Sequence, residues 1–341
     1  MAGAGMAGLA AAAHARARGA SVLLLEKLAR PGGALRLSSG VIWRHTRFED
    51  FRAECPDGDP ALQRLIHERL DADLQWLEEL GAPVTERTTG NPRTTGWRFD
   101  PEGLTHALTR AAGAPQTLAA LRQRPEDGTP VILATGGFAA SRAMLALHVT
   151  PEAEHVLLRT APGATGDGLR LGLEAGATLG PGLDQVDARL MPAAPISPGD
   201  FVPAAQLYAR EAVVTNAEGE RFEARAWSEI DVAQWAARQR HARVWLQVPR
   251  ARLTDAIRER IAVAERLGAA VQRTAAGVGV ECVAGVTTTL GGLAVDTDAR
   301  AAPGVYAAGH DAGGIATGGY ASGLAAALVF GRIAARSALE S

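Results

Sequence analysis

The sequence predicts an α/β fold with a mostly parallel sheet, interrupted by a smaller α+β insertion. Three features carry this prediction. Glycines, a helix and a strand follow one another from Gly3 to Glu26. An α/β pattern of the same kind returns after Val295, with a strand, a glycine loop and a last helix. Between them, residues 181–205 are rich in Pro and Gly, which indicates a domain boundary.

The N-terminal segment reads as half of a βαβ unit of the Rossmann-like kind. An Ala-rich helix, Leu9 to Arg18, ends at Gly19 and is followed by the apolar strand 21–25. A strand normally precedes the first glycine of such a unit, and here only Met1 and Ala2 do so. We therefore expect a truncated first strand.

The remaining elements place this unit in a larger organisation. Apolar periodicity and glycine stops predict helices at 59–80, 103–112, 141–147, 167–176, 230–240, 252–268 and 322–336, and strands at 131–134 and 305–308. We expect a first domain part at 1–180, a cap or substrate domain at 181–282, and a second part of the first domain at 283–341.

The composition excludes several classes of protein. The net charge is −2, with no long block of one sign, which argues against nucleic acid as a partner. The two cysteines, Cys55 and Cys282, lie far apart and predict neither a metal site nor a disulfide, so a reducing, cytoplasmic setting fits. No apolar run is long enough to predict a membrane span. Lys27 is the only lysine, which we attribute to coding bias.

The glycines at the N-terminus form a GxGxxG pattern. Gly3, Gly5 and Gly8 would let the backbone turn sharply and approach a pyrophosphate at a helix N-terminus. Glu26 ends the next strand, where a carboxylate can bind the hydroxyls of an adenosine ribose. The alternative is a glycine-rich turn that binds no ligand.

Further glycine motifs follow along the chain. They are Pro31-Gly-Gly33, Ser38-Ser-Gly40, Ala134-Thr-Gly-Gly137, Thr165-Gly-Asp-Gly168, Gly219-Glu-Arg-Phe222, Thr289-Leu-Gly-Gly292 and Val305-Tyr-Ala-Ala-Gly309. In this order the chain resembles the FAD-dependent fumarate reductase/succinate dehydrogenase flavoprotein superfamily over nearly its whole length. The resemblance implies an FAD-binding domain with an inserted α+β cap, and FAD as the cofactor.

The resemblance also implies which residues contact FAD. Besides Gly3, Gly5, Gly8 and Glu26, these are Lys27, Gly32, Gly33, Ser38, Ser39, Gly40, Ala134, Thr135, Gly136, Gly137, Asp167, Gly309, His310, Asp311, Gly323 and Leu324. His310 stands where the family often has Glu, so either a ribityl contact or simple loop exposure is open there.

The loop Gly313 to Gly323 precedes the last apolar helix, whose positive end would face the flavin. Tyr320-Ala-Ser322 resembles the Tyr-x-Ser-Gly of the 3-ketosteroid Δ4-dehydrogenase branch. This implies that Tyr320 is a catalytic acid/base or hydrogen-bond donor to the substrate carbonyl, with Ser322 as its helper. The alternative is that Tyr320 is a packed aromatic and Ser322 a helix N-cap.

The chain departs from the fumarate reductase branch at its dicarboxylate-binding positions. Thr287 and Thr288 stand where that branch has a His, and its proton-donating Arg falls near Glu229. Arg221 and Arg225 lie close by, but we expect both in solvent. We expect His45 at the surface rather than in a covalent flavin link.

These features favour an FAD-dependent oxidoreductase that acts on CH–CH bonds next to a carbonyl, by hydride transfer through flavin N5. Its substrate would be a small, apolar carbonyl compound, and its electron donor or acceptor is open. The segment between Leu108 and Val131 is short for this family. A non-catalytic, degenerate flavin-binding relative is therefore an alternative. An NAD-dependent Rossmann dehydrogenase is another, but it leaves the C-terminal glycine loop without a role.

Overall fold

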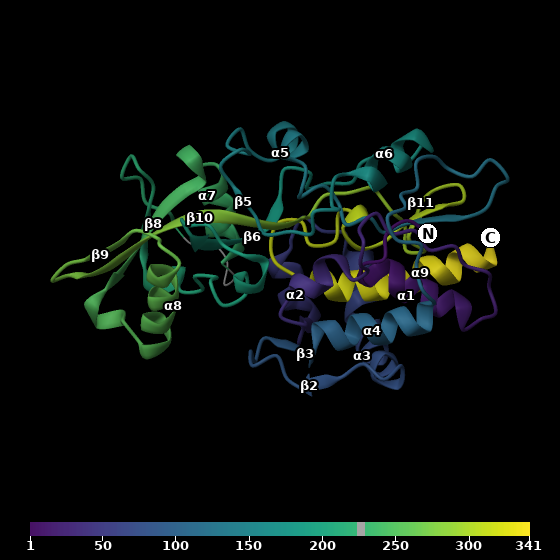
Figure 1. The fold of residues 1–341 in the computed structure, drawn as a ribbon, viewed down its shortest axis with the longest axis horizontal. Helices are drawn as coiled ribbons and strands as arrows, with labels where there is room; N and C mark the ends of the chain where they lie inside the picture. Colours follow the sequence, from purple (N-terminus) through teal and green to yellow (C-terminus); the bar gives the residue numbers. More distant parts are fainter. Residues whose placement is uncertain (224–228) are drawn as a thin grey trace. The chain divides into compact units, whose positions relative to one another are not determined.

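A computed structural model describes residues 1–223 and 229–341 of the chain. Its contacts divide the chain into two compact units. The first unit comprises Met1–Ala140, Ala161–Gln185 and Thr289–Ser341, and the second comprises Ser141–Thr160 and Val186–Thr288. Both ends of the chain therefore belong to one unit (Figure 1).

A parallel sheet lies at the centre of the first unit. Strand β12 (Val305–Ala307) pairs in parallel with β4 (Val131–Leu133), and the short β11 (Arg300–Ala302) lies antiparallel on its outer side. Beyond β4 the sheet continues through single parallel bridges, from Leu133 to Ala2, from Ala2 to Leu25, and from Leu25 to Gln116. The predicted α/β class is confirmed, although the expected strand 21–25 is present only as the bridges of Leu25.

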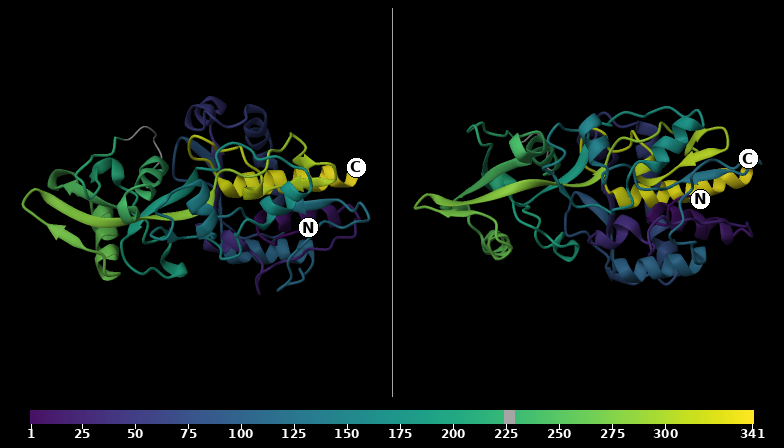
Figure 2. Two further views of the ribbon diagram at one scale, coloured as in Figure 1. Left: turned by 90° about the horizontal axis from the view of Figure 1, so that it is seen from above. Right: turned by 45° about the horizontal axis from the view of Figure 1, so that its top comes forward.

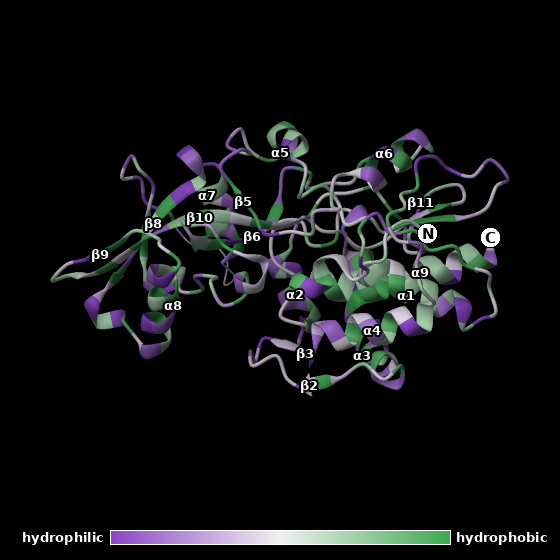
Figure 3. Ribbon diagram, in the orientation of Figure 1, coloured by the Kyte–Doolittle hydropathy of each residue, from purple (hydrophilic) through white to green (hydrophobic). Residues whose placement is uncertain are grey.

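Two apolar helices from opposite ends of the sequence pack side by side in this unit. They are α1 (Met6–Arg16) and α9 (Gly323–Glu340) (Figures 1 and 2). The contact is close because Gly331 has no side chain, and a Cβ there would lie 2.4 Å from the carbonyl oxygen of Ala7. Both helices are predominantly apolar in Figure 3, as buried helices should be.

The rest of the first unit surrounds this helix pair. An antiparallel sheet of the order β1-β3-β2 is formed by Val41–His45, Thr94–Phe99 and Val84–Glu86. The remaining helices are α2 (Phe48–Glu54), α3 (Pro60–Glu79), α4 (Pro101–Ala112) and α6 (Asp167–Glu174), together with the 3₁₀ turns η1 (Gly33–Leu37) and η6 (Gly309–Asp311). Asp59 and Asp100 cap α3 and α4, and each helix has Pro at its first position, which explains where both begin.

The second unit is an α+β structure built around the long strand β10 (Gly277–Thr289). Its other strands are β5 (Leu157–Leu158), β6 (Val186–Pro192), β7 (Val213–Thr215), β8 (Arg243–Pro249) and β9 (Val271–Arg273), and its helices are α5 (Arg142–His148), α7 (Ile230–Ala237) and α8 (Asp255–Arg266). Residues 141–160 join this unit because β5 pairs with β10 and the Thr150 hydroxyl donates to the carbonyl of Ala237. The sequence predicts a start of this unit only at residue 181, whereas 141–160 also belong to it.

None of the helices in the described residues combines the length and hydropathy that crossing a bilayer requires.

Candidate active site

The N-terminal glycine loop of the first unit is shaped by close backbone packing. Gly3 has a φ of +99°, and a Cβ on Gly8 would lie 1.8 Å from the carbonyl oxygen of Gly3. Gly5, the N-cap of α1, differs from both, because no described atom outside Gly5 and its two chain neighbours lies within 4 Å of the position that its Cβ would take. Gly3 and Gly8 thus serve the fold, whereas Gly5 leaves open space at a helix N-terminus. Such a position suits the approach of a phosphate group.

The second glycine pair lies against this loop. The N–H of Gly32 donates to the carbonyl of Ala4 at 2.8 Å, and a Cβ on Gly33 would lie 3.5 Å from the Cα of Gly5. Beside this contact the structure has a cavity of about 370 Å³. It is lined by Leu28, Ala29, Arg30, Pro31, Gly33, Arg36, Leu37, Ala161 and Pro162. The cavity therefore adjoins the predicted phosphate loop.

The predicted turn at residues 38–40 ends the segment that follows this glycine pair. The Ser38 hydroxyl donates to the carbonyl of Leu35 and accepts from the N–H of Gly40. Ser39 is exposed, and Gly40 has a φ of +72° and packs on the carbonyl of Phe99. Hydrogen bonds within the turn therefore stabilise it, and Ser39 lies at the surface.

Glu26 is buried at the end of the bridge made by Leu25. One carboxylate oxygen accepts from the N–H of Ala4 at 2.7 Å, and the other accepts from the N–H of Leu28 at 2.8 Å. Each carboxylate oxygen can accept a further hydrogen bond, so both stay available to a pair of hydroxyl groups.

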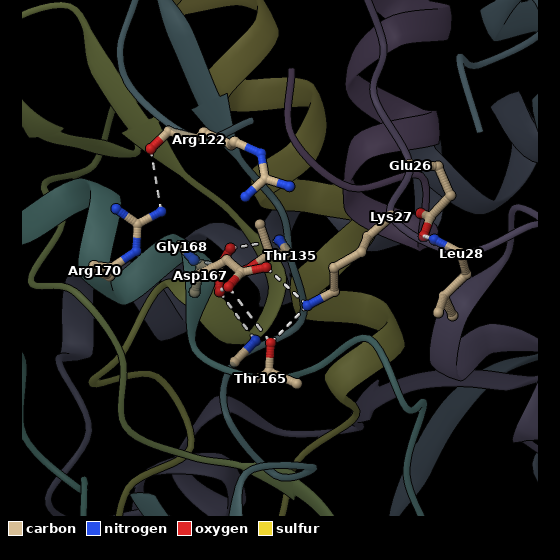
Figure 4. Close-up of polar contacts among 11 residues, drawn as sticks. Glu26, Lys27, Leu28, Arg122, Thr135, Thr165, Asp167, Gly168 and Arg170 are labelled. Atoms are coloured by element: carbon tan, nitrogen blue, oxygen red, sulfur yellow. Dashed lines mark hydrogen bonds and ion pairs between the residues drawn. The ribbon is translucent and has the colours of Figure 1, made fainter. Parts of the chain in front are cut away.

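The neighbouring Lys27 reaches across to the N-terminus of α6. Its ammonium donates to the Thr165 hydroxyl at 2.6 Å and forms an ion pair with Asp167 at 2.8 Å (Figure 4). The structure thus brings Lys27 and Asp167 together, with Glu26 next to Lys27 in the chain; all three are predicted contacts of one cofactor.

The loop after β4 faces the loop after β12. Gly136 and Gly137 have φ values of +94° and +74°, which only glycine adopts easily. The N–H of Ala134 donates to the carbonyl of Ala2 at 2.8 Å, and Thr135 and Gly137 contact Asp311. Burial raises the pKa of Asp311 above its usual value, although the hydrogen bonds from Thr135 and Gly137 act in the opposite direction.

The C-terminal glycine loop begins beside the N-terminal helix. A Cβ on Gly309 would lie 3.3 Å from the Cβ of Ala7, the second residue of α1. His310 is half-buried, and its Nε2 lies 2.7 Å from the position of a Cβ on Gly323. Leu324, the second residue of α9, is half-buried as well. Glycine motifs from both ends of the chain therefore converge in one unit.

Tyr320 and Ser322 lie at the end of this loop and contact Trp43 of β1. The half-buried Tyr320 has its ring 5.1 Å from that of Trp43, and Ser322 is the N-cap of α9. The Ser322 hydroxyl accepts from the N–H groups of Ala325 at 3.3 Å and Trp43 at 3.5 Å, so its own proton can still be donated.

His45 is buried, not at the surface as the sequence analysis expected, with only 1% of its area exposed. Its ring stacks on Phe51 at 5.1 Å, and its Nε2 lies 3.3 Å from the carbonyl oxygen of Tyr320. Since a carbonyl only accepts, Nε2 carries the proton. Burial lowers the pKa of His45, which keeps the ring neutral at pH 7.

Trp43 and His45 are not among the site residues that the sequence predicts. Their short apolar strand between two turns was the signal in the sequence that could have pointed to them. It does not reveal their contacts with Tyr320, because Tyr320 is far away in the sequence. Of the positions that depart from the fumarate reductase branch, Arg221 is exposed as expected and the Thr287 hydroxyl accepts from Arg159 at 2.9 Å. Arg225 lies outside the described residues.

A Rossmann-like sheet, an open glycine at a helix N-terminus and a buried ribose-type carboxylate define a dinucleotide-binding α/β protein. The family model for an FAD binding domain matches residues 1–126 and 122–324 of the chain. The chain therefore belongs to the FAD binding domain family, and FAD is its cofactor. This confirms the resemblance found in the sequence.

Individual relatives agree with this assignment. Fumarate reductase (cytochrome) from Shewanella frigidimarina is 25% identical over 268 residues, which cover 64% of this chain and 46% of the relative. NADH:fumarate oxidoreductase from Klebsiella pneumoniae (strain 342) is 26% identical over 216 residues, which cover 50% of this chain and 23% of the relative. The chain thus spans less than half the length of these relatives.

Solved structures show the same fold. A flavocytochrome c3 fumarate reductase in its open conformation has a TM-score of 0.75 and 21% identity, with 99% of this chain and 77% of that chain covered. The 3-ketosteroid-Δ4-(5α)-dehydrogenase from Rhodococcus jostii RHA1, in complex with 4-androstene-3,17-dione, has a TM-score of 0.73 and 18% identity, with 99% and 96% covered.

The residues present fit FAD. The open position at Gly5 is a cradle that a Cβ would fill, and it adjoins a cavity of about 370 Å³. The oxygens of Glu26 can each accept one more hydrogen bond, and α9 begins at the C-terminal glycine loop. These features supply partners for a pyrophosphate, for a ribose and for the flavin end of the cofactor.

Proposed function

We propose that this chain is an oxidoreductase that introduces or removes a C=C bond next to a carbonyl group of a small, largely apolar substrate. The observation that carries the proposal is the position of Tyr320, a half-buried phenol beside Ser322 at the N-terminus of α9. FAD supplies the hydride acceptor or donor when it is bound. The residues of the chain then have to bind the carbonyl and move one proton.

Tyr320 would donate a hydrogen bond to the substrate carbonyl oxygen and so stabilise the negative charge that develops on it. Two contacts orient this residue, namely the packing of its ring against Trp43 and the hydrogen bond from His45 to its backbone carbonyl. Burial lowers the pKa of His45, so the ring that holds this carbonyl adds no charge beside Tyr320.

Ser322 would assist Tyr320. Its hydroxyl oxygen is held by the N–H groups of Ala325 and Trp43, which leaves its proton directed elsewhere. The N-terminus of α9 adds a partial positive charge, which favours a developing oxyanion nearby. The capping role and the catalytic role of Ser322 are therefore compatible.

An apolar carbonyl substrate is favoured over a dicarboxylate by the charges of this region. The half-buried ring of Tyr320 packs on the buried ring of Trp43, and the sequence from Gly309 to Gly331 contains no arginine. Two carboxylates would need cationic partners of the kind that Arg provides. We thus place the substrate nearer to ketosteroids than to fumarate.

The experiment that tests the proposal is an anaerobic single-turnover reaction of the FAD-loaded protein, followed by the visible absorbance of the flavin. A 3-ketosteroid should bleach the flavin, and succinate should not. Tyr320→Phe should slow the bleaching about 100-fold or more, because general acid or base catalysis typically contributes a factor of that size.

Tyr306→Phe is the matched control. Tyr306 is fully buried in the same unit and its hydroxyl donates to the carbonyl of Ser337, so its loss should leave the rate unchanged. Equal rates for Tyr320→Phe and the wild type would remove Tyr320 from the mechanism. A protein that binds FAD but is bleached by neither substrate would instead support the non-catalytic interpretation.

A further inference from the structure

Asp311 is a carboxylate with no exposed area at the end of η6. A buried carboxylate is costly unless donors surround it. The Thr135 N–H donates to one of its oxygens at 2.5 Å, while the Thr135 hydroxyl and the Gly137 N–H donate to the other, each at 3.0 Å. All three donors belong to the loop after β4, so this one side chain fixes the conformation of that loop.

The same network extends to the N-terminus of α6. The Thr135 hydroxyl, which donates to Asp311, also accepts from the Gly168 N–H at 2.9 Å (Figure 4). Gly168 leaves room for the carboxylate, since a Cβ there would lie 2.2 Å from an oxygen of Asp311. Asp167, next in the chain, is the residue that pairs with Lys27.

The backbone of Asp311 fixes a third segment. Its carbonyl oxygen accepts from the N–H of Leu293 at 2.8 Å, and Gly292 packs so closely that a Cβ would lie 2.6 Å from that oxygen. Thr135 belongs to the first segment of the first unit, Gly168 to its second segment and Leu293 to its third, and the second unit is inserted between these segments. One residue thus holds three segments of the first unit that are distant in sequence.

We propose that Asp311 is a positioning residue for FAD: it orders the loop after β4 and the N-terminus of α6 before the cofactor binds. This differs from the direct contact that the sequence analysis predicted. The carboxylate oxygens are directed at Thr135 and Gly137, and they are fully covered. The role therefore acts through the residues that Asp311 holds, and it is independent of the reaction proposed for Tyr320.

The test compares the wild type with Asp311→Asn in the full chain. Asparagine has the same shape, but its amide group donates, so it cannot accept from all three donors. We expect the dissociation constant for FAD to rise about tenfold or more. In the FAD-free protein, hydrogen exchange of the Thr135, Gly137 and Gly168 amides should become faster, while that of α1 and α9 should not change.

The combination of the two measurements separates the possible roles. Weaker FAD binding with unchanged exchange in the FAD-free protein would mean direct contact and would overturn the proposal. Faster exchange with an unchanged dissociation constant would mean a structural role only and would overturn it too. Asp298→Asn, at a side chain that is 55% exposed, is the matched control and should change neither quantity.

Thr135→Val keeps the test decisive if Asp311→Asn does not fold. It removes only the hydroxyl that links Gly168 to Asp311 and keeps the backbone N–H. The proposal predicts weaker FAD binding with faster exchange of the Gly168 amide, and Thr135→Ser should restore most of both. A folded Thr135→Val protein with the FAD affinity of the wild type would contradict the proposal.

Discussion

Gly5 offers the sharpest separation of cofactor binding from folding. Its backbone is extended, with φ −80° and ψ −168°, which any residue adopts, and no described atom outside Gly5 and its two chain neighbours lies within 4 Å of a Cβ placed there. Gly5→Ala should therefore leave the free energy of unfolding within about 0.5 kcal/mol of the wild-type value. The added methyl group would, however, occupy the space at the N-terminus of α1.

The expected loss concerns hydrogen bonds between a phosphate and the first N–H groups of α1. A hydrogen bond to a charged group contributes about 1.5–3 kcal/mol, so the loss of one raises the dissociation constant for FAD about 10- to 150-fold. Fluorescence titration of the FAD-free protein measures this constant, and urea unfolding measures stability. Gly199→Ala, where the space around the Cβ position is equally open, is the control in the second unit. Unchanged FAD affinity in Gly5→Ala would refute the reasoning.

Two further predictions concern the packing of α1 against its neighbours. Gly331→Ala places a Cβ 2.4 Å from a carbonyl oxygen of α1, so urea unfolding should show a loss of about 1–3 kcal/mol, and a loss under 0.5 kcal/mol would contradict the close contact. Burial, with help from the charges of Arg18, Arg332 and Arg336, lowers the pKa of His14 from 6.5 to about 4. Because the unfolded chain takes up this proton first, stability should fall as the pH drops from 6.5 to 4, by on the order of 1–3 kcal/mol. His14→Gln should reduce that fall, and an equal pH dependence in both proteins would exclude His14 as its source.

Much of the first unit could be predicted because its signals are local. The expected helix at 59–80 is α3 (Pro60–Glu79), since Asp59 and Pro60 start it and Gly81 follows its end. The expected helix at 322–336 begins as predicted at its Ser322 cap but continues to Glu340 as α9. Periodicity and capping depend on neighbours in sequence, which the sequence displays directly.

Other features depend on contacts between distant residues and could not be predicted in this way. His45 lies in a strand with no strong alternation, and its burial follows from Phe51 and the carbonyl of Tyr320. The burial of Asp311 also depends on distant residues, because its partners Thr135 and Gly137 are adjacent to it only in the folded chain. The strand expected at 21–25 is reduced to bridges, since the segments beside it pair with it at single residues.

Hydrogen exchange of the full chain, with and without saturating FAD, tests most directly whether both ends of the chain bind one cofactor. FAD should slow exchange in two segments together, Gly3–Gly8 with the first turn of α1, and Gly309–Leu324 with the start of α9. Slower exchange in only one of these segments, or in neither, would contradict a site assembled from both ends.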